Sequence, residues 1–246
     1  MPFEQTTKGN PYRLTKKQHF HMEAIIKKFC INGKLKVIYK NGNFLFCKPD
    51  NKRFIGNRVW SQELEVNISH PIERNFLSQV INIENGEGIS NHASISNYHL
   101  LWCLRWHYSI METEDYDLYN NFPCRSLDKE FEELLESKGK VPVRSGGKIA
   151  GRFKATLDIK ALLELEDNKK IYDGLEWQIV ESKGKRFISA DCYGDLMVMT
   201  ISPKYCLIAG KELNEMHCFV TDDEVDKLNL QSMNASHDFY FCCDDS

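Results

Sequence analysis

The chain has 246 residues, of which 42% are hydrophobic and 11% aromatic, and its formal net charge is −3. This length and apolar content are typical of a globular protein with one large core or two small ones. The mild charge excludes a global basic field of the kind that attracts nucleic acid or anionic membrane to a whole protein.

The first ten residues, MPFEQTTKGN, lack the apolar stretch of a signal peptide, and no later segment has about 18 uncharged apolar residues in a row. We therefore expect a cytoplasmic protein without a membrane partner. The nine cysteines include no CxxC pair, so we expect mostly free thiols that pack as small apolar side chains. No metal site and no cofactor is predicted.

The first third of the chain predicts a helix followed by a hairpin. Apolar residues such as Ile25 and Phe29 fall at helical spacing within Lys16–Cys30, which predicts a short amphipathic helix. The dipeptide Asn41-Gly42 lies between two β-rich runs and is a strong hairpin signal. We expect its strands at about Lys34–Lys40 and Asn43–Cys47.

The middle of the chain is expected to be helical. The runs NRVWSQELEVNI and PIERNFLSQVINI predict helices, with Pro71 suited to a first turn. In SISNYHLLWCLRWHYSIM, apolar residues cover nearly every side, which predicts a buried central helix. Residues 112–152 are acidic, polar and glycine-containing, which indicates a peripheral excursion or lid within a single domain spanning residues 1–246.

The last third is rich in β-strand signals. A hairpin is predicted around the Lys183-Gly184-Lys185 turn, with strands in LEWQIVES and RFISA. The meander continues with strands in DLMVMTIS and KYCLIAG. A helix is then predicted in TDDEVDKLNLQSMNASH, followed by a last strand in DFYFCC. The predicted fold class is therefore α+β, with the buried helix packed on a largely antiparallel sheet built from the N-terminal hairpin and the C-terminal strands.

Positive charge is concentrated in the first quarter of the chain, in a set that we call the basic N-terminal lobe. Its members are Lys16, Lys17, Lys27, Lys28, Lys34, Lys36, Lys40, Lys48, Lys52, Arg53 and Arg58. Such a lobe could hold RNA or DNA phosphates, with Phe20, Tyr39 and Phe44 nearby for base stacking. Lysines of this kind can equally form an ordinary solvated helix face and hairpin.

Two histidines near the N-terminus are candidates for chemistry. His19 could serve as a general base or phosphate ligand, or it could support the turn into the helix through a backbone hydrogen bond. On a helix, His21 would point about 200° away from His19, so the two rings could not share one metal ion. We expect His21 to be interfacial or exposed.

Further candidates lie at a strand end and in the buried helix. Asp191 in ISADCYGD either lines a pocket or forms an Asx-turn, and Asp195 shares its loop. Arg105 is the one cation in LLWCLRWHY, and because an unpaired buried charge is costly, we expect an ion pair with Glu63 or Glu73, or else an anion-binding role.

A column of potential metal ligands also lies on the buried helix. His99, Cys103 and His107 recur every four residues and span about 12 Å, which is too long for all three to reach one ion. Core packing is the favoured interpretation of this column.

Six ordered motifs resemble a bacterial family that is a domain of unknown function. They are QHFHMEAIIKKF, NGKLKVIY, NYHLLWCLRWHYS, RFISADCYGD, TISPKYCLIAG and VDKLNLQSMNASHDFYF. The family opens with His-His-aromatic-x-Pro-x-x-x-Leu-x-x-Phe and has a late Ser-Asp-x-Pro signature. This chain departs from it at Gln18, Met22, Ala190 and Tyr193, and keeps His19 and Asp191.

Two functional hypotheses compete. In the first, the chain is a cytosolic hydrolase acting on nucleic acid or a nucleotide, and the sporadic distribution of the resembled family implies a toxin or phage-defence effector. His19 would be the acid/base, Asp191 would orient it or carry a second proton, and Arg105, Lys16 and Lys17 would bind the phosphate.

In the second hypothesis, the chain is a non-catalytic binding or regulatory protein with a degenerate site. It would contact protein or nucleic acid through the basic N-terminal lobe. A third alternative is a divalent-metal enzyme that uses Asp191, Asp195 and Glu63. The sequence alone leaves open whether the chain is an enzyme.

Overall fold

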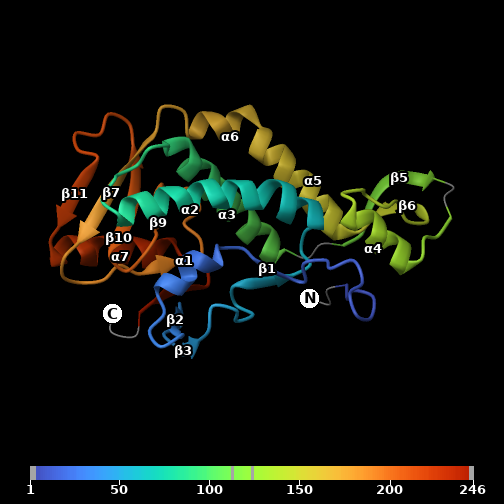
Figure 1. Cartoon of the computed structure of the whole chain (residues 1–246), viewed down its shortest axis with the longest axis horizontal. Coiled ribbons are helices and arrows are strands. Elements are labelled where there is room, and N and C mark those ends of the chain that lie inside the picture. Colours follow the sequence, from blue (N-terminus) through green and yellow to red (C-terminus); the bar gives the residue numbers. More distant parts are fainter. Residues whose placement is uncertain (1–3, 112–113, 123–124, 244–246) are drawn as a thin grey trace.

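Figure 1 presents the computed structural model of the chain, which describes residues 4–111, 114–122 and 125–243. The helices are α1 (Glu23–Lys28), the π-helix η1 (Leu64–Ser69), α2 (His70–Glu84), α3 (His92–Ile110), α4 (Lys129–Ser137), α5 (Gly151–Glu164), α6 (Glu166–Ile171) and α7 (Asp222–Ala235). The strands are β1 (Lys17–His19), β2 (Leu35–Tyr39), β3 (Phe44–Cys47), β4 (Ile55–Asn57), β5 (Tyr116–Phe122), β6 (Gly146–Ile149), β7 (Glu176–Ser182), β8 (Ser189–Ala190), β9 (Val198–Thr200), β10 (Tyr205–Gly210), β11 (His217–Val220) and β12 (Phe239–Cys242).

One antiparallel sheet joins the two ends of the chain, in the strand order β3-β2-β12-β8. The predicted turn at Asn41-Gly42 closes the β2–β3 hairpin, with Gly42 at a φ of 84°, a backbone conformation that favours glycine. Leu35 and Val37 of β2 face the core. The prediction of an α+β fold whose sheet combines the N-terminal hairpin with C-terminal strands is confirmed.

The other C-terminal strands form a separate sheet, which corrects the expectation of a single one. Its strand order is β11-β7-β10-β9, with β11 parallel to β7 and the other pairs antiparallel. Strand β8 lasts only two residues before the chain turns away at Asp191. The following strand β9 therefore pairs with β10 instead of extending the first sheet.

Helix α3 is the buried central helix that the sequence predicts. Its residues Tyr98, Leu101 and Trp102 are fully buried, and it packs against α2, α5 and β7. Figure 1 shows α2 and α3 in the middle of the molecule, with β7, β10 and β11 at one end and β5, β6 and α4 at the other. The main hydrophobic core thus forms around α3.

The N-terminal region differs from the prediction. Residues Lys17–His19 form strand β1, which pairs antiparallel with β4, and the helix begins only at Glu23. The side chain of Gln18 is buried and bonds both the backbone N–H and the carbonyl of Trp60. This pairing stabilises an extended backbone here, so the helical spacing applies only after Met22.

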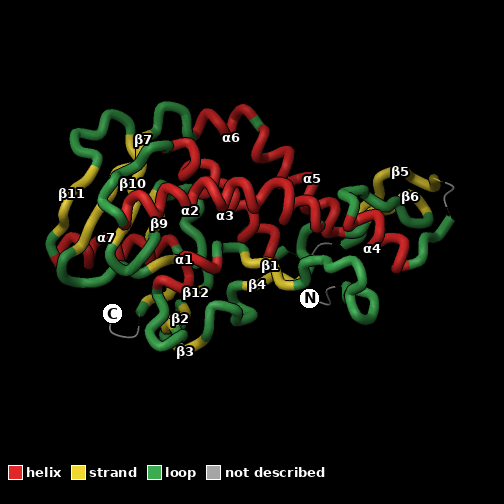
Figure 2. The backbone as a smooth tube through the Cα atoms, viewed as in Figure 1, coloured by secondary structure: helices red, strands yellow, loops and turns green. Residues whose placement is uncertain are grey.

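The segment 112–152 contains β5, α4 and β6, which Figure 2 shows at the end of the molecule away from the second sheet. Its charged helix α4 is less exposed than its composition predicts, because Glu132, Glu133 and Glu136 are buried. Glu136 forms ion pairs with Arg58 (2.6 Å) and Arg152 (2.9 Å). These bonds connect α4 to Arg58, which follows β4, and to Arg152 in the first turn of α5.

Candidate functional site

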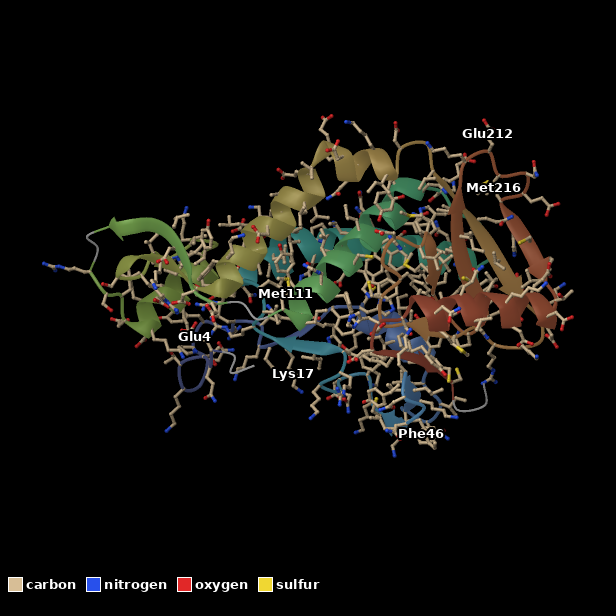
Figure 3. The ribbon with its side chains drawn as sticks, turned by 180° about the vertical axis from the view of Figure 1, so that it is seen from behind. Glu4, Lys17, Phe46, Met111, Glu212 and Met216 are labelled. Carbon is tan, nitrogen blue, oxygen red and sulfur yellow. The ribbon has the colours of Figure 1, made fainter. Side chains whose placement is uncertain are left out.

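A groove of about 520 Å³ opens on the surface of the basic N-terminal lobe. Its lining residues come from β1, from the β2–β3 hairpin, and from the loop and strand that follow the hairpin. They are Lys17, Lys34, Phe46, Cys47, Lys48, Asp50, Asn51, Lys52, Ile55 and Asn57. Figure 3 shows Lys17 and Phe46, which belong to this lining, on the same lower side of the molecule.

Local backbone pairing positions the groove residues. In the β1–β4 pair, Lys17 lies opposite Asn57 and His19 lies opposite Ile55, so these four side chains share one face. The loop from Lys48 to Phe54 is held by backbone hydrogen bonds from Asn51 N to Lys48 O and from Phe54 N to Asn51 O, both 3.0 Å. The groove therefore has a fixed frame with lysines around it.

The electrostatics of the groove are strongly one-sided. Of the described residues that line it, four are lysines and one, Asp50, carries a carboxylate. Among the described residues, the ion pair in the groove joins Lys17 Nζ to Asp50 Oδ2 at 3.9 Å, and both side chains are more than half exposed. Such an exposed pair is worth little, so the groove keeps a net positive field.

His19 lies beside the groove, on the same face of β1 as Lys17. Its ring Nε2 is 3.3 Å from the carbonyl oxygen of Pro49 in the groove loop. Because a carbonyl only accepts hydrogen bonds, Nε2 carries the hydrogen and Nδ1 keeps the lone pair in the neutral ring. Burial lowers the pKa of His19, which favours that neutral form.

Arg105 forms the structural ion pair that the sequence favours, and the partner is Glu73. The two side chains are 2.6 Å apart, and Arg105 is 2% exposed. The guanidinium also donates to the backbone carbonyl of His19 and lies over the Trp60 ring, 5.1 Å from its centroid. Arg105 thus supports the backbone at His19 from beneath, while its charge is neutralised by Glu73.

Asp191 is fully buried, and its carboxylate binds the protein's own backbone. It accepts hydrogen bonds from the N–H groups of Cys192 (2.9 Å), His237 (2.8 Å), Asp238 (2.8 Å) and Phe239 (3.3 Å). Burial raises the pKa of Asp191, and these four donors oppose the rise. The carboxylate caps the turn into β12.

The predicted site residues therefore do not meet at one point. Arg105 touches His19 only at the backbone, and no hydrogen bond or ion pair among the described residues joins the Asp191 carboxylate to either. Lys17 lines the groove, whereas Lys16 is exposed and outside the lining. His19 and Lys17 remain together at the surface.

His21 is buried, which corrects the expectation of an interfacial or exposed side chain. Its ring stacks on Trp102 at 4.0 Å, and its Nδ1 is 2.8 Å from the Tyr98 hydroxyl. That hydroxyl also accepts a hydrogen bond from the Met22 N–H, so its own hydrogen is available to His21 Nδ1. Burial and the nearby Arg105 charge lower the pKa of His21 to about 3.

The other metal-ligand candidates are engaged in packing or ion pairs. His99 is buried with its Nδ1 2.8 Å from the Tyr172 hydroxyl, and Cys103 Sγ donates to the Gly194 carbonyl at 3.6 Å. Glu63 pairs with Lys160 at 2.8 Å. Within residues 4–111, 114–122 and 125–243, no group of three His, Cys, Asp or Glu side chains is placed to hold a metal ion.

The sequence indicates the groove lysines only as part of the basic N-terminal lobe. Phe46, which is 45% exposed, is not among the stacking residues that the sequence predicts, whereas Phe20, which is among them, is buried in the core. The two-residue alternation along NFLFCK would have placed Phe44, Phe46 and Lys48 on one face.

No family model, curated protein or solved structure matches this chain. The resemblance to the bacterial family consequently stays a prediction. None of the helices in the described part of the chain is long and apolar enough to cross a membrane.

Proposed function

We propose that this chain is a non-catalytic nucleic-acid-binding protein that holds phosphates in its lysine-lined groove. The observation that carries the proposal is the convergence of Lys17, Lys34, Lys48 and Lys52 on one concave surface, whose described lining includes a single carboxylate. They come from three places, namely β1, the residue before β2 and the loop after β3, and the fold brings these places together. Phosphate groups are the ligands that such a surface attracts.

Mutual repulsion of the lysines supports the same proposal. Like charges held in one groove raise the energy of the folded protein, and a polyanion relieves that repulsion while releasing its own counterions. The chain as a whole is slightly acidic, with a formal charge of −3. The charge is therefore polarised, and a polyanion would approach through the basic side.

The geometry favours binding over hydrolysis because two of the predicted site residues have structural partners. Asp191 is bonded to four backbone N–H groups, and Arg105 is paired with Glu73. A catalytic acid/base or a phosphate ligand must reach its substrate. Neither of these side chains lines the groove.

Hydrolysis of the bound nucleic acid is a second candidate function, and the position of His19 favours it. The neutral ring with its lone pair on Nδ1 lies on the same face as Lys17, beside the groove loop. It could accept a proton from a nucleophile such as water or a ribose hydroxyl. The toxin or phage-defence role stays a prediction from the resemblance alone.

Binding is expected to be strongly salt-dependent. Four lysine–phosphate contacts give a slope of about −2.8 in log K against log salt for a single strand, so affinity should fall about 50-fold between about 50 and about 200 mM salt. Fluorescence anisotropy of a short labelled oligonucleotide measures this slope. A slope near zero would contradict the proposal.

Charge reversal locates the binding surface. K34E/K52E removes two groove contacts and should weaken binding about 25-fold at about 100 mM salt, with the slope reduced to about −1.4. The control K169E/K211E changes the net charge equally at exposed lysines outside the groove, and it should bind as the wild type does. An equal loss of oligonucleotide affinity in both variants would show that the groove is not the binding site.

The same samples, run on a denaturing gel, test the second candidate. Cleavage of RNA or DNA by the wild type that His19→Ala abolishes would support hydrolysis. Intact nucleic acid after incubation with the wild type would exclude it and leave binding as the function.

A further inference from the structure

The outer face of the β2–β3 hairpin carries exposed aromatic rings next to lysines. Phe44 is 59% exposed and Phe46 is 45% exposed. In the strand register, Phe46 lies opposite Lys36 and Phe44 lies opposite Ile38, so these side chains share the solvent face. The opposite face, with Leu35 and Val37, belongs to the core.

The two rings form an ordered pair at the surface. Their centroids are 5.9 Å apart at an interplanar angle of 79°, and Lys36 Nζ lies 5.0 Å from the centroid of the Phe44 ring. Strand β3 is also an edge strand, where exposed apolar side chains favour aggregation and are usually avoided. A ligand that covers these rings would explain their presence there.

The rings are continuous with the groove. Phe46 is itself part of the groove lining, together with Lys34 and Lys48, which flank the open end of the hairpin. A ligand with its phosphates in the groove would therefore bring its bases to Phe46 first and to Phe44 next.

We propose that the ligand is single-stranded nucleic acid, and that its bases stack on Phe44 and Phe46 while its phosphates occupy the groove. This inference rests on the proposed function and names the strand form that the same site takes. Aromatic rings beside a basic groove bind single strands because every base offers a flat π-face. In a duplex the bases are stacked on each other and cannot reach the rings.

An anionic membrane is the other ligand that lysines and exposed phenylalanines attract. The concave groove favours the strand, because a flexible chain of phosphates can enter it whereas a flat bilayer surface cannot reach its lining. Vesicles of anionic lipid are therefore included in the test as a competing ligand.

The test compares F44A/F46A with the matched control F219A. Phe219 lies on β11, is 57% exposed, and has Lys183 Nζ 3.6 Å from its ring centroid, so it resembles Phe44 in exposure and in its neighbouring charge. All three phenylalanines are at the surface, so the variants should fold, which circular dichroism checks.

Four probes separate the contributions of bases and phosphates. They are a short single strand, the duplex of the same sequence, inorganic polyphosphate and anionic vesicles. F44A/F46A should bind the single strand about 30-fold more weakly, since each stacked base contributes about a factor of five or more. Its affinity for polyphosphate and for the duplex should be unchanged, and F219A should match the wild type throughout.

A spectroscopic variant tests the stacking directly and does not depend on the loss of a side chain. F44W should bind the single strand as well as the wild type does, and its additional indole fluorescence should be quenched by the bound bases. F219W should show no such added quenching. Absence of quenching in F44W on a strand that binds would overturn the inference.

The outcomes distinguish this inference from the proposed function. If K34E/K52E weakens binding while F44A/F46A behaves like F219A, the groove binds phosphates but the stacking inference is wrong. If neither the strand nor polyphosphate binds the wild type, the proposed function itself fails. If F44A/F46A loses vesicle binding alone, the rings serve a membrane and the inference is overturned.

Discussion

Replacing Asp191 with alanine is expected to lower the free energy of unfolding by about 4 kcal/mol, because buried N–H groups left without an acceptor cost about 1–3 kcal/mol each. The carboxylate accepts from four backbone N–H groups, three of which belong to residues 237–239 in the turn into β12. The loss is a large part of the total stability of a typical domain. Urea unfolding followed by circular dichroism measures it.

Two further variants separate a structural role for Asp191 from a chemical one. D191N keeps one accepting oxygen, but its amide NH₂ group faces two N–H donors. Its free energy of unfolding should therefore be about 2 kcal/mol lower than that of the wild type. D195A changes an exposed carboxylate on the same loop and should unfold as the wild type does. A D191A protein as stable as the wild type would contradict the capping role.

Acidification is expected to destabilise the fold through two buried histidines. The pKa of His21 is lowered from 6.5 to about 3 and that of His99 to about 4, with burial as the main cause in both. The unfolded chain therefore binds protons first as the pH falls below about 6.5, and the free energy of unfolding declines from there toward the folded pKa values. At about pH 5 each of these two histidines should lower the free energy of unfolding by about 2 kcal/mol relative to its value at about pH 8.

His21→Asn isolates one of the two contributions. The asparagine oxygen can accept from the Tyr98 hydroxyl as Nδ1 does, but the side chain does not titrate. The variant should be less stable than the wild type at about pH 8, because it loses the stacking on Trp102, yet its further loss of unfolding free energy at about pH 5 should be about 2 kcal/mol smaller. H107N, which removes a histidine at an exposed position on α3, is the control variant. Unfolding curves at both pH values that show the same dependence for H21N would refute this explanation.

The elements that the sequence predicts well are those set by local physical rules. The hairpin follows from the backbone preference of Asn41-Gly42, and the all-round apolar pattern of α3 identifies it as the central helix. Helix α7 begins after Thr221, whose side chain forms a capping box with Glu224. Each of these depends on residues close together in the chain.

The errors arise where distant residues decide the local structure. The stretch around His19 and His21 has helical spacing, but Gln18 binds Trp60 and holds the backbone in a strand. That pairing leads His21 into the core beneath Trp102. The buried acidic side chains of α4 likewise depend on Arg58, which follows β4, and on Arg152 of α5.

The groove, too, could not be predicted from residues close together in the chain. The sequence indicates a basic region, but only the β1–β4 pairing and the hairpin bring Lys17, Lys34 and Lys52 around one concave surface. The engagement of Arg105 by Glu73 and of Asp191 by backbone amides is equally a product of tertiary packing. The sequence therefore indicates the charges of Arg105 and Asp191 but not the groups that they bind.

Lysine acetylation footprinting tests the central claim, that single-stranded nucleic acid binds in the groove. The protein is treated with an acetylating reagent with and without a short single strand, and each lysine's modification is quantified by mass spectrometry. We predict that Lys17, Lys34, Lys48 and Lys52 become protected, while Lys169 and Lys211, exposed outside the groove, react as before. Unchanged reactivity of the four groove lysines at a saturating concentration of the strand would contradict the account.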